Sequence, residues 1–156
     1  MKRHKALRSL SQEHHHGLML AQLIKTGSPK YKGLPHELDG KKLYTIKFFE
    51  KNLIPHFRKE EQVLFPLLRS KSENIAIIVD ELINQHKKVR LLIERLKKTV
   101  EPEKVLDELG RLLEIHIRKE ERELFQMIQE VLSEEELLKL ETNMGVASPA
   151  VKFNSQ

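Results

Sequence analysis

Two segments of the chain, sixty residues apart, have nearly the same pattern of histidine, glutamate and phenylalanine. The first is HFRKEEQVLF, which begins at His56, and the second is HIRKEERELF, which begins at His116; seven of the ten positions are identical. In an α-helix, residues i and i+4 lie one above the other, so His56 and Glu60 can reach a common point. The same spacing relates His116 to Glu120. Each pair is therefore expected to act as a chelating unit.

Two further histidines occupy the middle of apolar helical stripes. His14 has apolar residues seven and four positions before it and seven and ten positions after it, and His86 has the same frame. A helix that faces a core normally places Leu or Ile at such positions. We therefore expect four helices each to point one imidazole inward. In the triplet at residues 14–16, His14 is the predicted ligand and His15 the alternative. The histidines that are not ligands are expected at the surface or in hydrogen-bond contact with a ligand.

Inward-facing glutamates need a compensating positive charge, because an unpaired carboxylate in a bundle core is strongly unfavourable. No lysine or arginine shares the inward positions, whereas four-helix bundles hold two metal ions between facing helices with glutamate and histidine ligands. Two divalent ions carry more charge than two carboxylates return, so a bridging oxide or hydroxide, or an external anion, is expected too. Nitrogen and oxygen ligands suit Fe, Mn or Zn. The predicted ligands are His14, His56, Glu60, His86, His116 and Glu120.

Composition narrows the function classes. The 156 residues include no cysteine, which excludes disulfides, thiolate nucleophiles and iron–sulfur clusters. The formal net charge is +5, but basic and acidic residues are interleaved, and two tyrosines, six phenylalanines and no tryptophan leave little for base stacking, so no nucleic-acid partner is expected. No apolar run approaches a membrane span or a secretory signal. We expect a soluble, cytoplasmic protein without a membrane partner.

Apolar periodicity predicts four long helices that position these residues. They cover about residues 5–25, 40–70, a segment from the SKSEN turn to Thr99, and a segment that begins near Pro102 and continues through Ile128. Glycine and proline are concentrated between residues 26 and 40, the one long connection. No segment shows strand alternation, and the other connections are short. The prediction is an all-α, up-down-up-down four-helix bundle.

Three details refine this prediction. Pro55 and Pro66 each remove a backbone hydrogen bond, so a kink is expected near one or both. Ser133 and Glu136 form a capping box that opens a short fifth helix. Residues 1–143 are assigned to one bundle domain, and 144–156 to a flexible tail.

The motifs resemble the hemerythrin-like HHE cation-binding domains. The resemblance spans about residues 5–130 and rests on EHHHG, HFRKEEQVLFP, the lone His86 and HIRKEERELF. It implies a four-helix bundle with a non-haem di-iron site, in which the four histidines are ligands and Glu60 and Glu120 bridge the irons. Members of that family bind dioxygen, respond to oxygen, nitric oxide or redox state, or take part in iron handling and repair.

The chain departs from the oxygen-carrying members of that family at two places. Arg90 stands four residues after His86, where the carriers have a second histidine, which argues against simple reversible oxygen carriage. The carriers also place the last carboxylate five residues after its histidine, as Glu121 would be, whereas regular helix geometry favours Glu120. The cysteine-containing segment of the repair members is absent.

Other polar residues near the motifs could either contribute to the centre or lie at the surface. His36, in the long loop, is an alternative extra ligand, although a solvated side chain is the favoured interpretation. Glu61 and Glu121 could accept hydrogen bonds from the ligand histidines. Exposed ion pairs with Arg58 and Arg118 are the favoured interpretation.

Three functions fit such a centre. The first is a binding or sensing module for oxygen, nitric oxide or peroxide; the second is a redox enzyme that turns over peroxide or nitric oxide; the third is iron storage or delivery. The expected partner is thus a small diatomic molecule or peroxide. The sequence does not identify a protein partner or an oligomeric state, and it does not decide whether the protein is an enzyme.

Overall fold

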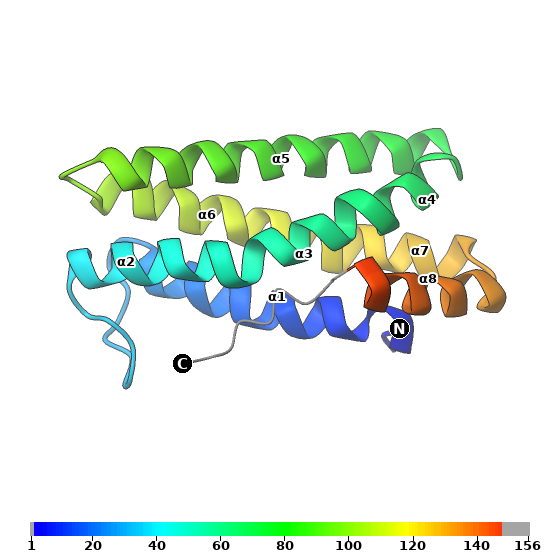
Figure 1. The fold of residues 1–156 in the computed structure, drawn as a ribbon, viewed down its shortest axis with the longest axis horizontal. Helices are drawn as coiled ribbons and strands as arrows, with labels where there is room; N and C mark the ends of the chain where they lie inside the picture. Colours follow the sequence, from blue (N-terminus) through cyan, green and yellow to red (C-terminus); the bar gives the residue numbers. More distant parts are fainter. Residues whose placement is uncertain (1, 148–156) are drawn as a thin grey trace.

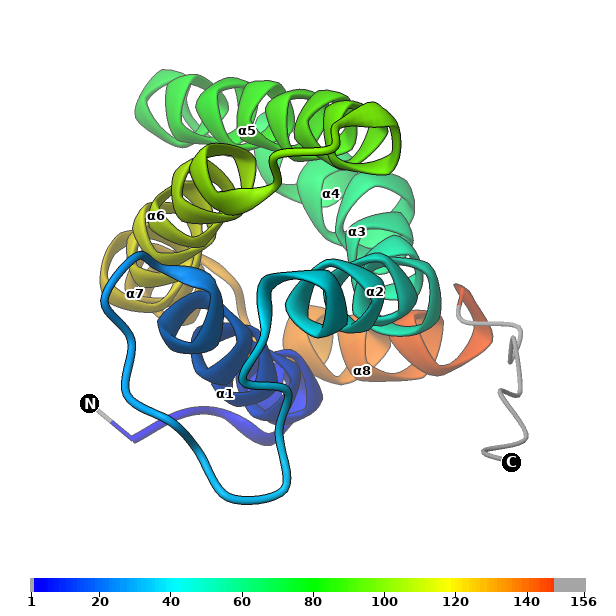
Figure 2. The same ribbon diagram turned by 90° about the vertical axis from the view of Figure 1, so that its left-hand side faces the viewer.

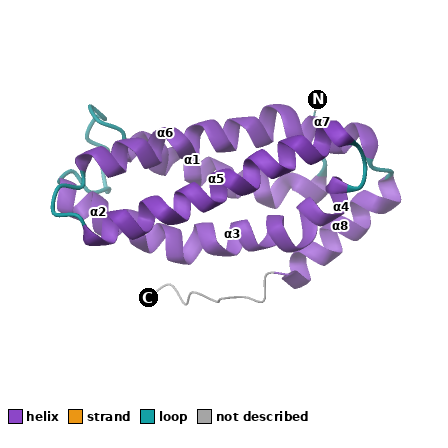
Figure 3. Ribbon diagram, turned by 90° about the horizontal axis from the view of Figure 1, so that it is seen from above, coloured by secondary structure: helices purple, strands orange, loops and turns teal. Residues whose placement is uncertain are grey.

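The computed structural model describes residues 2–147, and this part of the chain is helical with no strand, as predicted for an all-α protein (Figure 3). None of the described helices is long and apolar enough to cross a membrane. The first helix, α1 (Lys5–Ile24), matches the predicted range closely. The long loop after it contains Gly27 and Gly33, which both have a positive φ of 81° that side chains rarely adopt.

The second helical segment runs without a break from residue 38 to 69, but its winding changes twice. Two five-residue π-helical turns interrupt it, and each ends shortly before a proline, Pro55 or Pro66. A π turn makes room for a proline, which has no N–H and clashes with the preceding turn. The successive elements are α2 (Leu38–Phe48), η1 (Phe49–Leu53), α3 (Ile54–Lys59), η2 (Glu60–Leu64) and α4 (Phe65–Arg69).

The second half of the chain repeats this design. A π turn again lies within the histidine motif, η3 (Glu120–Leu124), although the helix directly after it contains no proline. Proline is therefore not the sole cause of these turns. The other elements are α5 (Glu73–Lys98), α6 (Glu103–Lys119), α7 (Phe125–Val131) and α8 (Glu134–Ala147).

Serine side chains cap the starts of α5 and α8. The Ser72 hydroxyl accepts a hydrogen bond from the backbone N–H of Ile75 (3.1 Å) at the start of α5. The predicted capping box is confirmed: the N–H of Glu136 donates to Ser133 Oγ (3.1 Å), and the N–H of Ser133 donates to a Glu136 carboxylate oxygen (3.0 Å). Within the predicted tail 144–156, α8 continues to Ala147, and residues 148–156 lie outside the described part.

The long segments surround a common axis. Seen from one end, α5, α6, α1 and the α2–α4 segment form a ring, and α8 packs on the outside of this ring (Figure 2). The α1–α2 loop and the α5–α6 turn lie at one end of the molecule, whereas the α4–α5 and α7–α8 turns lie at the other (Figure 1). This arrangement brings residues from all four segments to the middle of the bundle.

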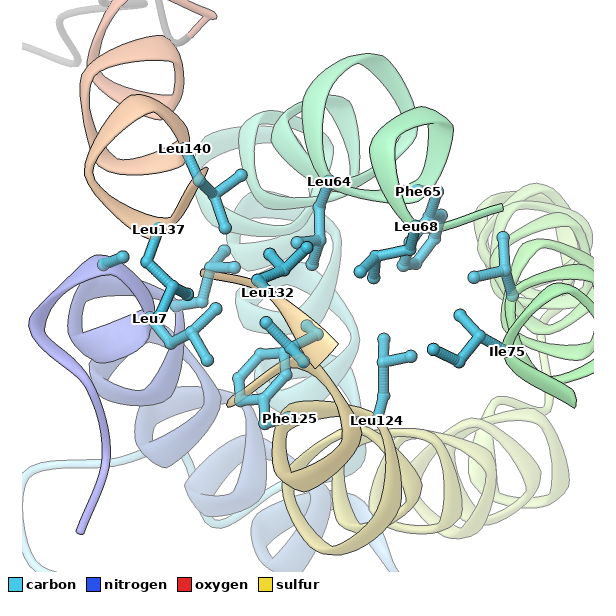
Figure 4. Packing of buried hydrophobic residues seen from close by; sticks show 14 of the residues in the cluster. Leu7, Leu64, Phe65, Leu68, Ile75, Leu124, Phe125, Leu132, Leu137 and Leu140 are labelled. Carbon is cyan, nitrogen blue, oxygen red and sulfur yellow. The ribbon is translucent and has the colours of Figure 1, made fainter. Parts of the chain in front are cut away.

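Two apolar clusters fill the ends of the bundle. One lies near α8, where Leu7, Leu64, Phe65, Leu124 and Phe125 are fully or almost fully buried and Leu137 and Leu140 of α8 cover them (Figure 4). The other fills the opposite end, around the C-terminal halves of α1 and α5 and the start of α6. The polar centre lies between these two clusters, so water reaches it from neither end.

Close packing between α1 and α6 depends on Gly110. A Cβ atom at this position would lie 2.9 Å from the carbonyl oxygen of Ala21, a backbone atom that cannot move aside easily. Gly110→Ala is therefore expected to lower the free energy of unfolding by about 1–3 kcal/mol, measured by chemical denaturation. Gly145→Ala is the control, because a Cβ there meets no atom within 4 Å. It should stabilise α8 by about 0.5–1 kcal/mol, and equal effects of the two substitutions would contradict the packing argument.

Candidate metal centre

Six polar side chains meet in the middle of the bundle, and all six are buried. Their exposed fractions are 4% or less, and both glutamates are completely buried. Each of the four long helical segments contributes one histidine, and the two π turns that follow the histidine motifs each begin with a glutamate. The six are His14 on α1, His56 on α3, Glu60 on η2, His86 on α5, His116 on α6 and Glu120 on η3.

The six residues form two overlapping groups that share both glutamates. Each group offers four ligand atoms within 4.8 Å of one another, which is the size of a single metal coordination sphere. The first half-site, as we name it, adds His14 and His56 to the glutamates; the second half-site adds His86 and His116. Two metal ions placed in these groups would have the two carboxylates between them.

Glu60 lies between the two half-sites. Its Oε2 atom is 3.4 Å from His56 Nε2, and its Oε1 atom is 3.1 Å from His86 Nε2. Glu120 Oε1 lies 3.5 Å from His14 Nε2 and 2.8 Å from His116 Nε2. Each carboxylate therefore contacts one imidazole of each half-site, as a bridging ligand would.

Every imidazole is held by a hydrogen bond on its outer nitrogen. Nδ1–H of His14 donates to Glu121 (2.6 Å), and that of His86 donates to Glu61 (2.5 Å). The other two Nδ1–H groups donate as follows: His56 to Glu13 (2.7 Å), and His116 to Gln85 (2.7 Å). Since Nδ1 bears the proton, the Nε2 lone pair of each ring points into the centre.

These four hydrogen bonds join the helical segments in a ring. The imidazole on α1 donates to a glutamate of η3, and the imidazole on α6 donates to a glutamine of α5. The imidazole on α5 donates to a glutamate of η2, and the imidazole on α3 donates to a glutamate of α1. Each bond joins two segments that are neighbours in the end view (Figure 2). Each segment thus supplies one inward imidazole and one acceptor for a neighbour's imidazole.

The inner atoms fit a pair of cations. Nε2 of His14 lies 3.1 Å from Nε2 of His56, and Nε2 of His86 lies 3.2 Å from Nε2 of His116, so lone pairs face each other in both half-sites. All four carboxylate oxygens of Glu60 and Glu120 are buried without a hydrogen-bond partner among the described residues. Such unpaired acceptors are costly unless a positive ion lies between them.

The pKa values in the metal-free chain reflect this unpaired charge. Burial, together with the neighbouring charge of Glu120, raises the pKa of Glu60 well above its usual range. The outer glutamates behave in the opposite way: burial opposes ionisation of Glu61, but hydrogen bonds from His86 and Arg90 outweigh it and lower its pKa to about 2. Three of the four outer acceptors are carboxylates and the fourth is the amide of Gln85, while Glu60 and Glu120 need a cation beside them to be ionised together.

Glu61 and Glu121 do not make the ion pairs that the sequence favoured. Arg118 pairs with Glu114, and the partners of Glu121 are His14, Ser11 and Arg3. The favoured interpretation is therefore wrong, and the alternative, hydrogen bonds to the buried imidazoles, is what the structure shows. The reason is tertiary: these glutamates face the imidazole of a neighbouring helical segment.

Arg90 closes the second half-site on the α5 side. Its guanidinium binds both oxygens of Glu61 (3.2 Å each) and lies over the ring of Phe57, 5.6 Å from the centroid. Phe57 in turn stacks on His86, with ring centroids 3.7 Å apart. The position where oxygen carriers have a further histidine therefore holds a cation that supports His86 through Glu61.

A cavity of about 100 Å³ reaches the centre from the side of α1 and α3. Three of the buried imidazoles line it, namely those of His14, His56 and His116, while the exposed residues of its wall are His16 and Asn52. Most of the remaining wall is apolar. Such a space accommodates a molecule of a few atoms beside the ligand nitrogens.

The other histidines lie outside the cluster. His15 and His16 are exposed on α1, so of the triplet only His14 joins the buried group. His36 is exposed in the long loop, where its Nε2 donates to the Tyr31 carbonyl (3.0 Å). Gln85 and Glu13 were not identified from the sequence; a signal was present, since each directly precedes an inward histidine.

The core of this helical bundle holds two histidine pairs and two shared carboxylates, a set of groups suited to binding metal cations. The comparison with protein families agrees, because residues 2–128 match the hemerythrin HHE cation binding domain. The chain belongs to this family. Comparisons with curated proteins and with solved structures found no match.

The unpaired carboxylates predict a trade-off between stability and binding. Glu60→Gln should raise the free energy of unfolding of the metal-free chain by about 1–4 kcal/mol, because an amide of nearly the same shape does not have to be held protonated in the folded core, as the Glu60 carboxyl does. The gain should grow as pH rises above the ordinary carboxyl pKa of about 4.3, since the unfolded chain then loses a proton that folded Glu60 retains. Thermal unfolding with a chelator at several pH values measures this difference. A destabilised Glu60→Gln chain would contradict the account.

Proposed function

We propose that the chain binds two iron ions in its buried centre and takes up a small molecule, such as oxygen, nitric oxide or peroxide, from the adjacent cavity. The observation that supports this most directly is the pair of four-residue groups that share Glu60 and Glu120. Six protein ligands for two ions leave coordination positions free. Bound ferrous ions would supply electrons to the small molecule.

The residues of the chain then have distinct tasks. The four imidazoles provide neutral nitrogen ligands whose tautomer is set by their outer partners, and the two carboxylates provide the negative charge. The apolar clusters at both ends exclude bulk water, and the cavity beside α1 and α3 provides a way in for a small molecule. His14 and His56 both line this cavity, whereas His116 alone represents the second half-site.

Metal content and colour test this proposal together. The purified chain, reconstituted anaerobically with ferrous ion, should contain two iron ions per chain and gain absorption in the near-ultraviolet and visible range on exposure to air. Repeated consumption of peroxide with a reductant would instead assign an enzymatic role to the same centre. Zinc or manganese as the metal of the native protein would contradict the choice of iron.

Removing one shared carboxylate should disable the centre. Glu60→Ala is expected to reduce bound iron from two ions per chain to one or none, because both groups lose a ligand. Glu114→Gln serves as the control, since Glu114 forms partly exposed ion pairs with Lys25 and Arg118. It is not one of the six residues of the centre. Elemental analysis after gel filtration gives the stoichiometry. Two ions in the Glu60→Ala chain would exclude a bridging role.

Filling the cavity should impede access without removing the metal. Leu53 is buried and lines the cavity, so Leu53→Trp is expected to slow azide binding to the iron-loaded chain by about one order of magnitude. Stopped-flow absorption measures the rate, and iron content should stay unchanged. Leu91→Trp, at an exposed position on α5, is the matched control. Unaltered azide kinetics in Leu53→Trp would show that ligands enter elsewhere.

A further inference from the structure

The centre is built twice, from equivalent positions of the two halves of the chain. His56 corresponds to His116, Glu60 to Glu120 and Glu61 to Glu121, each sixty residues later. His14 corresponds to His86, and the residue directly before each of them accepts the hydrogen bond from the histidine of the neighbouring motif. Any chemical difference between equivalent positions would make the two half-sites unequal.

One pair of equivalent positions differs in charge. Glu13, before His14, accepts the Nδ1–H of His56, whereas Gln85, before His86, accepts the Nδ1–H of His116; both distances are 2.7 Å. The Glu13 carboxylate lies between the Nδ1–H of His56 and the ammonium group of Lys59 (2.6 Å), whereas the side chain of Gln85 is an uncharged amide. In the first half-site both imidazoles thus donate to carboxylates, while in the second one donates to a neutral amide.

The lysines at equivalent positions of the two motifs have different ion-pair partners because of this difference. Lys59 is buried, and its ammonium group contacts the second oxygen of Glu13 (2.6 Å). The equivalent Lys119 has no carboxylate at Gln85 and pairs instead with Glu81 (3.3 Å) and Glu123 (3.4 Å). The asymmetry is therefore part of the packing around the centre.

A carboxylate makes an imidazole a better metal ligand than an amide does. A charge-assisted hydrogen bond to Nδ1–H is stronger than a neutral one and increases the electron density on Nε2. Outer hydrogen-bond partners of this kind change metal affinity by about 10- to 100-fold. The ammonium of Lys59 shares the charge of Glu13, so the lower limit of this range is the expected size.

We propose that the two half-sites are unequal because Glu13 stands where the second half-site has Gln85, so that the first half-site binds its metal more tightly and fills first. This inference rests on the proposed two-metal centre. It assigns Glu13 and Gln85 as positioning residues, which act on the metal through His56 and His116. The half-site that fills first is also the one with both imidazoles in the cavity wall.

Four chains test the proposal: the wild type, Glu13→Gln, Gln85→Glu and the double exchange. Each is titrated anaerobically with Co²⁺ at about pH 8, where free imidazoles are neutral, and the stepwise affinities are read from cobalt absorption and calorimetry. Glu13→Gln should weaken the first step by about tenfold and leave the second nearly unchanged. Gln85→Glu should strengthen the second step by about tenfold and leave the first nearly unchanged. The double exchange should restore two separate steps.

Controls separate the possible failures. Glu81→Gln removes a half-exposed carboxylate from α5 that contacts Lys119 and no imidazole, so both steps should stay as in the wild type. If the wild type binds fewer than two Co²⁺, the proposed two-metal centre fails. If it binds two but neither single substitution changes the ratio of the affinities, or the effects fall on the opposite steps, this inference alone is overturned. Should Gln85→Glu not fold, the first-step affinity of Glu13→Gln decides.

Discussion

The burial of two carboxylates that have no hydrogen-bond partner among the described residues is the constraint on which the rest of the structure depends. Glu60 and Glu120 are completely inaccessible, and their oxygens meet imidazole nitrogens whose lone pairs point at the same space. The carboxylate oxygens and the nitrogen lone pairs repel one another unless a positive charge lies between them. The residues around the centre therefore either hold these groups in place or keep out water that would solvate them.

The two apolar clusters and the outer hydrogen bonds divide that work. The clusters lie at both ends of the centre and provide the burial that stabilises the bundle. The outer glutamates, with Arg3 and Arg90 behind two of them, orient the imidazoles. The burial that stabilises the bundle thus comes from residues outside the centre, and this allows the centre itself to be energetically unfavourable without a cation.

Sequence reasoning reached the inner centre because its information is local. The spacing of His56 and Glu60, and the apolar frames of His14 and His86, determine which side chains face inward, and the structure brings all six predicted residues together. The helices and the capping box at Ser133 were predictable for the same reason.

The outer partners were harder to predict, because they depend on which helical segments are neighbours. Glu121 meets an imidazole 107 positions earlier in the chain, a relation that no local spacing encodes. The π turns are also hard to predict, since η3 forms without a proline. Glu13 and Gln85 were nevertheless within reach of sequence analysis, because they directly precede the equivalent histidines His14 and His86.

The ring of hydrogen bonds between the four segments has a mechanical consequence. Every inward imidazole is anchored to a different segment from its own, so no single helix can withdraw its ligand by local fraying. Displacement of one helical segment distorts two of the four imidazole hydrogen bonds, and through them it affects the two neighbouring segments. If a metal ion occupies the centre, withdrawal of any one imidazole from it would require several helical segments to move together, so the ion would exchange more slowly than local fraying of a single helix allows.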